Sequence, residues 1–171
     1  MGLAEGGPFA GLRFAILTCS TSRSPEEDGS GAALVAAVQA AGGEVVHRAL
    51  EPDDRGRIAA RLRAWADAGG CDVVLTTGGT GLGPQDVTPE ATADVATRGA
   101  PGLAEWIRLR GLEQTPLAAL SRGVAAIRGQ TLLVNLAGSP RAARHGVESL
   151  HPLLAHAVAV LRGGGHDAPP G

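Results

Sequence analysis

A glycine-rich run at residues 78–83 is the part of the sequence best suited to bind a ligand. It follows an apolar, β-branched run at residues 73–77 and precedes Thr88-Pro89, where a helix is expected to begin. Glycines leave backbone N–H groups uncovered, and the positive end of a helix dipole adds to them, so such a loop can bind phosphate or pyrophosphate. All 15 basic residues are arginines, which excludes the P-loop, because that motif requires a lysine.

Two carboxylates accompany this loop. Asp86 follows it directly, and Asp53 lies in the Pro52-Asp53-Asp54 segment, after a second apolar run. Each of them has an ordinary explanation as a charge at a helix N-terminus or as a cap of a loop or helix. However, Mg²⁺ on a nucleotide is usually held by one or two carboxylates and by phosphate oxygens. The two acids beside a phosphate-binding loop therefore favour metal-assisted phosphoryl or nucleotidyl transfer.

Polar residues also gather in two other segments that follow predicted strands, at residues 20–31 and 137–140. Asp28, Ser30 and Ser139 in these segments could also be simple helix caps. The carboxyl ends of parallel strands meet at one edge of a sheet. We therefore expect both segments to converge on the glycine-rich loop.

The other titratable residues give weaker signals. The five histidines show no metal-ligand spacing with cysteines or carboxylates. Cys19 and Cys71 are typical of buried, reduced thiols in a chain without a signal-peptide pattern, so we expect a cytoplasmic protein. Arg98 and Arg122 are candidates for anion contacts, although a surface position would also explain them.

Strands and helices alternate along the chain. Strands are predicted at residues 13–19, 44–50, 72–77, 123–127 and 131–136, and helices at 32–41, 54–68, 88–97, 102–111 and from 141 to about 162, with an interruption at Pro152. The nearly continuous apolar strands indicate a three-layer α/β/α single domain with a mostly parallel sheet and one antiparallel edge hairpin. We expect a disordered leader at residues 1–11, the domain at 12–162 and a flexible tail at 163–171.

The composition excludes several classes of partner. The chain has 171 residues, of which 44% are hydrophobic and 19% charged, as in a globular domain. Its net charge of −2 gives no electrostatic attraction for nucleic acid or an anionic membrane. No apolar run approaches the roughly 20 residues that a membrane span needs.

Taken together, the motifs resemble the MogA/MoaB family of molybdopterin-binding proteins, whose active members are molybdopterin adenylyltransferases. The resemblance covers about residues 13–162, including the segments 28–31 and 52–54. It rests on Thr76-Thr77-Gly78-Gly79-Thr80-Gly81, on Asp86-Val87-Thr88-Pro89-Glu90-Ala91-Thr92, on Arg98 with Pro101-Gly102 and Glu105, on Leu120-Ser121-Arg122, and on Gly138-Ser139-Pro140-Arg141-Ala142.

This resemblance implies that the protein transfers AMP from Mg·ATP to molybdopterin and releases pyrophosphate. Asp53 and Asp86 would be the catalytic residues and the Mg²⁺ ligands. The residues implied to line the pterin and phosphate pockets are Ser20, Asp28, Ser30, Gly31, Thr77, Gly78, Gly79, Thr80, Gly81, Gly138, Ser139 and Pro140. The family also implies a homotrimer or homohexamer, and a downstream molybdenum insertase as a partner.

Two departures from the family pattern and two alternatives remain. Ala137 stands where the family usually has proline, and residues 22–27 of the first segment are less typical. Without the proline the turn is less restricted, but its N–H groups remain.

The alternatives are a molybdopterin carrier that does not catalyse and a nucleotide-binding α/β domain outside the family.

Overall fold

The centre of the protein is a six-stranded sheet with the order β2-β1-β3-β6-β5-β4. The computed structural model describes residues 6–165. Strands β2, β1, β3 and β6 are parallel, whereas β5 is antiparallel to β6 and β4 is antiparallel to β5. The strands are β1 (Arg13–Cys19), β2 (Glu44–Glu51), β3 (Val73–Thr77), β4 (Arg98–Gly99), β5 (Ala125–Arg128) and β6 (Thr131–Leu136).

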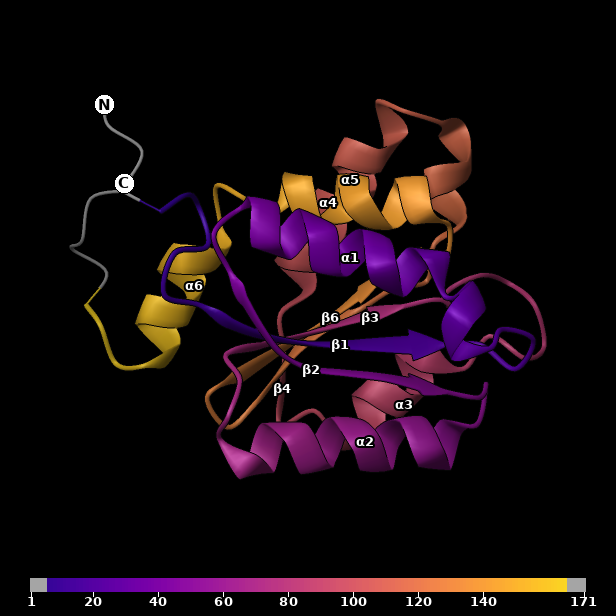
Figure 1. The fold of residues 1–171 in the computed structure, drawn as a ribbon, viewed down its shortest axis with the longest axis horizontal. Coiled ribbons are helices and arrows are strands. Elements are labelled where there is room, and N and C mark those ends of the chain that lie inside the picture. Colours follow the sequence, from indigo (N-terminus) through magenta and orange to yellow (C-terminus); the bar gives the residue numbers. More distant parts are fainter. Residues whose placement is uncertain (1–5, 166–171) are drawn as a thin grey trace.

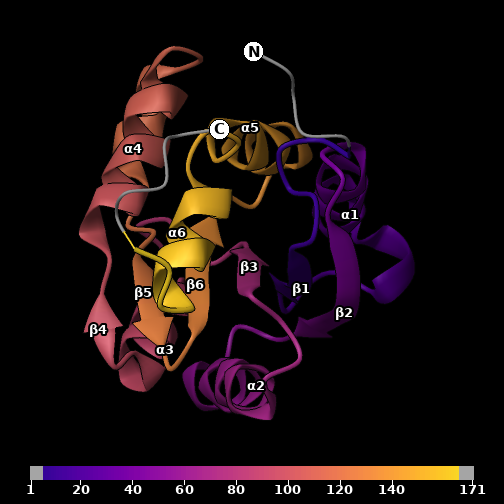
Figure 2. The ribbon, with the colours of Figure 1, turned by 90° about the vertical axis from the view of Figure 1, so that its left-hand side faces the viewer.

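Helices cover both faces of this sheet (Figure 1). They are α1 (Gly29–Ala40), α2 (Arg55–Ala68), α3 (Thr88–Val95), α4 (Pro101–Leu112), α5 (Pro140–Ser149) and α6 (Leu154–Leu161), with short 3₁₀ helices η1 (Pro25–Glu27) and η2 (Pro116–Leu120). Helices α1, α4 and α5 lie on one face, and α2 and α3 lie on the other, as the end view in Figure 2 also shows. The predicted three-layer α/β/α fold with an antiparallel edge is confirmed.

Strand β1 shows why a sheet with both faces buried reads as a continuous apolar run. Phe14 and Ile16 belong to the core beneath α1, α5 and α6. Leu17 belongs to the core beneath α2 and α3, as does Ala15. Successive side chains of a strand point to opposite faces, so each of these four residues meets a helical layer and is apolar.

Local signals fix several helix ends. Asp54 caps α2 by accepting a hydrogen bond from the Arg57 N–H, and Gly69 ends that helix in the left-handed conformation. The predicted last helix is interrupted at Pro152, between α5 and α6. Helix α1 begins at Gly29 and not at the predicted residue 32, because Asp28 caps it.

The domain starts before the predicted boundary at residue 12. The Phe9 side chain is fully buried in the core, and its N–H donates to the Ala41 carbonyl at 2.8 Å. Burial of this ring outweighs the glycine-rich character that suggested a loose leader. Residues 1–5 and 166–171, which hold the rest of the predicted leader and tail, lie outside the described residues. Within residues 6–165, every helix is too short or too polar to cross a bilayer.

Candidate functional site

The carboxyl ends of β1, β3 and β6 meet at one edge of the sheet, as their parallel order requires. A Cβ placed on Gly78, after β3, would lie 2.4 Å from the Cys19 carbonyl oxygen at the end of β1. A Cβ on Gly138, after β6, would lie 3.2 Å from Cα of Gly78. The Thr77 hydroxyl donates to the Ala137 carbonyl at 2.7 Å. The predicted convergence of the three segments is therefore present, with backbone against backbone.

Gly79 places the glycine-rich loop directly on the first turn of α3. Its φ is +65°, and its carbonyl accepts a hydrogen bond from the Thr88 N–H at 3.1 Å. A Cβ there would lie 2.3 Å from Oγ1 of Thr88. Both the left-handed backbone and the close approach require glycine at this position. The loop thus lies at the positive end of the α3 dipole, where an anion is stabilised.

Asp53 lies just after β2 and forms hydrogen bonds with Thr21 of the segment at residues 20–31. Its Oδ2 accepts hydrogen bonds from the N–H of Thr21 at 3.0 Å and from the Thr21 hydroxyl at 3.1 Å, and its own N–H donates back to that hydroxyl at 3.0 Å. The other carboxylate oxygen, Oδ1, is oriented toward the glycine-rich loop, since a Cβ on Gly79 would lie 3.5 Å from it.

Asp86 closes the same loop on its other side. Its Oδ2 accepts a hydrogen bond from the Gly83 N–H at 2.8 Å. A Cβ placed on Gly81 would lie 2.9 Å from this oxygen. Asp86 precedes α3, but its carboxylate bonds within the loop, and the capping position of α3 is taken by Val87 without a side-chain bond. Asp86 therefore caps the loop and not the helix, which agrees with the ordinary loop-cap explanation and leaves its second oxygen available.

Asp28 supports the site from beneath. The Asp28 carboxylate is buried and accepts hydrogen bonds from the Gly31 N–H, the Thr18 hydroxyl and the Arg48 guanidinium. Burial acts to raise the pKa of Asp28, but these three donors outweigh it and hold the pKa below its ordinary value. Gly31 has no room for a side chain, because a Cβ would lie 2.1 Å from Oδ2 of Asp28. Both residues therefore stabilise the start of α1 through the cap that Asp28 forms with the Gly31 N–H.

The serines of the segments at residues 20–31 and 137–140 also form hydrogen bonds. The buried Ser30 hydroxyl accepts a hydrogen bond from Arg23 at 2.6 Å, and the same guanidinium nitrogen donates to the Gly138 carbonyl at 3.3 Å. Ser139 caps α5 through the Ala142 N–H, and Pro140 occupies the first turn. The Ser20 N–H donates to the carbonyl of Glu51. Arg23, which carried no prediction, therefore joins two of the converging segments.

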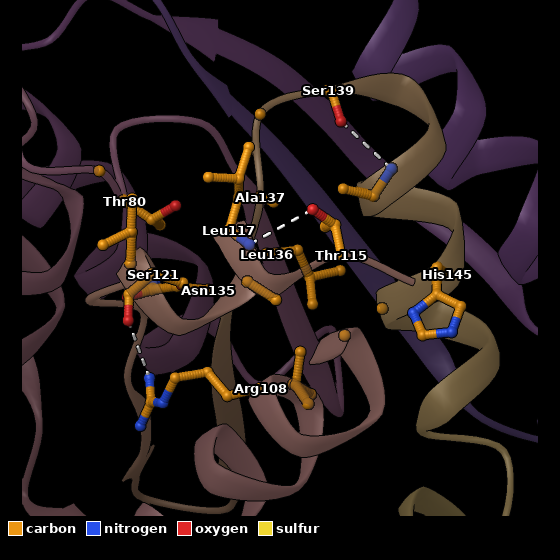
Figure 3. A pocket seen from close by; sticks show the side chains of 18 of the residues that line it. Thr80, Arg108, Thr115, Leu117, Ser121, Asn135, Leu136, Ala137, Ser139 and His145 are labelled. Carbon is orange, nitrogen blue, oxygen red and sulfur yellow. Dashed lines mark hydrogen bonds between the residues drawn. The ribbon is translucent and has the colours of Figure 1, made fainter. Parts of the chain in front are cut away.

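A cavity of about 590 Å³ opens between the glycine-rich loop, β6, α4, η2 and α5 (Figure 3). Six of the predicted residues line it, namely Gly79, Thr80, Gly81, Asp86, Gly138 and Ser139. The other predicted residues are not part of its lining: Ser20, Asp28, Ser30, Gly31, Asp53, Thr77, Gly78 and Pro140. The predicted set is thus brought to one edge of the sheet, but only part of it faces the cavity.

The wall opposite the glycine-rich loop was not predicted. It comes from α4 and η2, which supply Ile107, Leu117 and Leu120, and from α5, which supplies His145. Figure 3 labels Leu117 and His145 from this wall, together with Thr80 and Asn135 from the loop and β6. Arg108 also lines this wall, and its guanidinium donates to the Gly123 carbonyl at 2.7 Å. The sequence signal for this wall is the pair of leucines in the short segment after α4.

Asp53 and Asp86 each keep one carboxylate oxygen available for a ligand. No cluster of three or more His, Cys, Asp or Glu side chains suited to a metal occurs within residues 6–165. Oδ1 of Asp53 and Oδ1 of Asp86 receive no hydrogen bond from this part of the chain. Two carboxylates, each with one oxygen available, suit Mg²⁺ that is also bound by phosphate and water.

The cysteines and two of the histidines play no part in the site. Burial raises the pKa of Cys19 to about 12 and that of Cys71 to about 11, so both thiols stay protonated. His47 stacks on Trp65 with ring centroids 5.7 Å apart. His151 meets Phe9 edge to face at 5.1 Å.

The chain is similar to several known proteins. The family model described as "Probable molybdopterin binding domain" matches residues 15–156. The chain is 40% identical over 154 residues to the molybdenum cofactor synthesis protein cinnamon of Drosophila melanogaster, covering 88% of this chain and 26% of that protein. It is 38% identical over 117 residues to the molybdopterin adenylyltransferase of Helicobacter pylori (strain J99), covering 68% of this chain and 66% of that protein.

A solved structure extends the likeness to the fold. The crystal structure of the molybdopterin biosynthesis enzyme MoaB from Thermus thermophilus has a TM-score of 0.81 and 46% identity, and the match covers 89% of this chain and 97% of that one. The chain therefore spans nearly the whole of this neighbour, but only 26% and 66% of the two curated relatives.

Proposed function

Since the chain belongs to the family of probable molybdopterin-binding domains, we propose that it acts in molybdenum cofactor biosynthesis as a molybdopterin adenylyltransferase. It would transfer AMP from Mg·ATP to molybdopterin and release pyrophosphate. The similarity to the Helicobacter pylori molybdopterin adenylyltransferase supports the choice of reaction.

One observation carries the proposal: the cavity joins a glycine-rich end to an apolar end. Gly79, Gly81 and Gly138 form the first end beside Asp86, whereas Ile107, Leu117 and other apolar side chains form the second. A cavity of about 590 Å³ is of the size that encloses a small molecule. A flat ring bound at the apolar end would direct its phosphate toward the loop amides.

The chemistry assigned to the loop end is a substitution at phosphorus. A terminal phosphate oxygen of molybdopterin forms a bond to the α-phosphorus of ATP, the bond from that phosphorus to the bridging oxygen breaks, and pyrophosphate leaves. Backbone N–H groups of the glycine-rich loop and the N-terminus of α3 stabilise the negative charge on the phosphates. Asp53 and Asp86 would hold Mg²⁺, which neutralises phosphate charge when it is bound.

The main alternative is a molybdopterin carrier that does not catalyse, and one observation favours it. Asp53 does not line the cavity, and its Oδ2 is occupied by Thr21. A carrier needs only the cavity and the loop amides. A nucleotide-binding domain outside the family is excluded by the family match.

Release of pyrophosphate distinguishes the enzyme from the carrier. The protein is incubated with Mg·ATP, with and without molybdopterin, and pyrophosphate is measured over time. We expect release that depends on the pterin, that is abolished by Asp86→Asn, and that is kept by Asp67→Asn, since Asp67 pairs with Arg128 away from the cavity. Tight molybdopterin binding without pyrophosphate release would establish the carrier instead.

We also propose that the protein assembles as a homotrimer or homohexamer in the cytoplasm and that its product passes to a molybdenum insertase. Leu109 and Leu112 of α4 are exposed and do not line the cavity, and exposed apolar side chains can mark a contact surface. Size-exclusion chromatography with light scattering tests the assembly, and a monomer at micromolar concentration would contradict it.

A further inference from the structure

Arg122 connects both ends of the loop that carries Asp86. Its Nε donates to the Gly81 carbonyl at 2.8 Å, and its Nη2 donates to the Asp86 carbonyl at 2.6 Å. Its backbone N–H donates to the Thr80 carbonyl at 2.8 Å. The remaining guanidinium nitrogen, Nη1, pairs with Oε1 of Glu90 in the first turn of α3. One side chain therefore joins the glycine-rich loop to the helix that follows it.

These bonds fix the base of the loop and leave its tip exposed. Residues 82–85 lie between the two carbonyls that the guanidinium holds, and the Leu82 side chain at the tip is 67% exposed. Among the described residues, the Gly83 N–H alone donates a hydrogen bond to the Asp86 carboxylate. The Asp86 N–H donates in turn to the Gly83 carbonyl at 3.0 Å, so this turn holds Asp86 locally. Arg122 is the side chain that ties the turn to the Gly81 carbonyl and to α3.

Arg122 does not contact the substrate cavity. Ser121 lines the cavity, but Arg122 is absent from its lining. The guanidinium faces the loop carbonyls and Glu90, so the anion contact considered for this residue from the sequence is not what its geometry supports. The hydrogen bond from Arg122 holds the pKa of Glu90 below its ordinary value, so the pair remains ionised at neutral pH.

We propose that Arg122 is a positioning residue that places Asp86 for adenylyl transfer. This inference rests on the proposed function. A planar guanidinium can donate in three directions at fixed angles, whereas a lysine ammonium is a single compact charge. The arrangement therefore requires arginine and not merely a positive charge.

The test compares Arg122→Gln and Arg122→Lys with Arg128→Gln as a matched control. Arg128 also pairs with a carboxylate, that of Asp67, and donates to the carbonyl of Val95, but it lies beyond the C-terminal end of α3 and outside the cavity. For both Arg122 variants we expect turnover to fall, and the Mg²⁺ concentration for half-maximal rate to rise, by about 10- to 100-fold, as for other residues that orient metal ligands. The affinity for molybdopterin should be unchanged, because Arg122 is outside the cavity. Arg128→Gln should keep both kinetic values.

A second measurement separates this inference from the proposed function. Mn²⁺ binding in the presence of ATP is followed by electron paramagnetic resonance, which needs no turnover. If the wild type releases no pyrophosphate, the proposed function fails, but weaker Mn²⁺ binding in Arg122→Gln than in Arg128→Gln still supports the positioning role. The inference is overturned if Arg122→Gln matches Arg128→Gln in Mn²⁺ affinity, or if wild-type protein binds no Mn²⁺ at all. It is also overturned if Arg122→Lys behaves as wild type.

Discussion

Replacing Gly79 with alanine tests how tightly the glycine-rich loop lies on α3. The added Cβ would lie 2.3 Å from Oγ1 of Thr88, where ordinary contacts begin near 3.4 Å. The loop or the helix must therefore move by about 1 Å, a displacement that can reduce a rate by about 100-fold when it occurs at reacting groups. We expect Gly79→Ala to fold with reduced stability and to lose most of its adenylyl transfer.

The expected loss of stability has two parts. The left-handed backbone of Gly79, with φ of +65°, costs an alanine about 1–2 kcal/mol. Overpacking against Thr88 adds about 1–3 kcal/mol, and the lower entropy of the unfolded alanine chain returns about 0.4–1 kcal/mol. The net decrease in the free energy of unfolding is therefore about 1–5 kcal/mol.

Gly69→Ala is the matched control, because it separates the two parts. Gly69 has a similar φ of +71°, but a Cβ there would meet no atom within 4 Å. We expect this variant to lose only about 1 kcal/mol and to keep full activity. Both variants are measured by urea denaturation monitored by circular dichroism, together with the rate of pyrophosphate release.

A second substitution should restore part of the loss. The Thr88 hydroxyl accepts no hydrogen bond from a nitrogen or oxygen atom within residues 6–165, and its neighbour is the Cys19 thiol, which is a weak donor. Thr88→Ala therefore removes the obstacle at the cost of a weak contact at most. In a double-mutant cycle the two changes should couple favourably by about 1 kcal/mol or more. Equal destabilisation of Gly79→Ala and Gly69→Ala, or strict additivity in the cycle, would refute the close approach of the loop to α3.

Three further predictions concern the frame of the site and its metal. Asn135→Leu should lower the free energy of unfolding in urea by about 2–3 kcal/mol, because the amide accepts from the Val124 N–H and donates to two buried threonine hydroxyls; a neutral outcome would show that this network is dispensable. The pKa of Asp28 is lowered on folding, so its contribution to stability is present above the unfolded pKa of about 3.9 and is lost as the pH falls through the folded value. The thermal midpoint of Asp28→Asn should accordingly change less than that of wild type as the pH falls below about 4, and parallel profiles would disprove this. EDTA should stop adenylyl transfer, and added Mg²⁺ should restore it in wild type but not in Asp53→Asn; full activity in EDTA would exclude the metal.

The elements that the sequence predicts well are those with local signals. Asp54 and Gly69 mark the two ends of α2, and Pro152 marks the break before α6. Each signal acts through the backbone of neighbouring residues, so it needs no tertiary context. The parallel order of the strands follows from the alternation with helices, and the convergence of the strand ends follows from that order.

The elements that escaped prediction depend on distant partners. Strand β4 consists of Arg98 and Gly99 alone and exists because it pairs with Ile127 and Ala126 of β5. The 3₁₀ helix η2 forms a wall of the cavity only because α4 places it there. Two residues in a strand, or one turn of helix, carry too little periodicity to be recognised in a sequence.

The residues of the candidate site show the same difference between local signals and distant partners. The glycine-rich loop and Asp86 could be selected because residue types that bind phosphate and metal occur together in one short segment. For Asp28 and Ser139 the ordinary capping role is the one that the structure shows. The role of Arg122 could not be predicted, because its partners are main-chain carbonyls and a carboxylate 32 to 41 residues away.

The most direct test of the proposed function is detection of its product. Purified wild-type protein is incubated with molybdopterin and Mg·ATP, and the mixture is examined by mass spectrometry beside an Asp86→Asn sample. We predict a pterin species heavier by one adenylyl group in the wild-type sample and unmodified pterin with Asp86→Asn. Unmodified pterin in both samples, although both proteins bind it, would contradict adenylyl transfer.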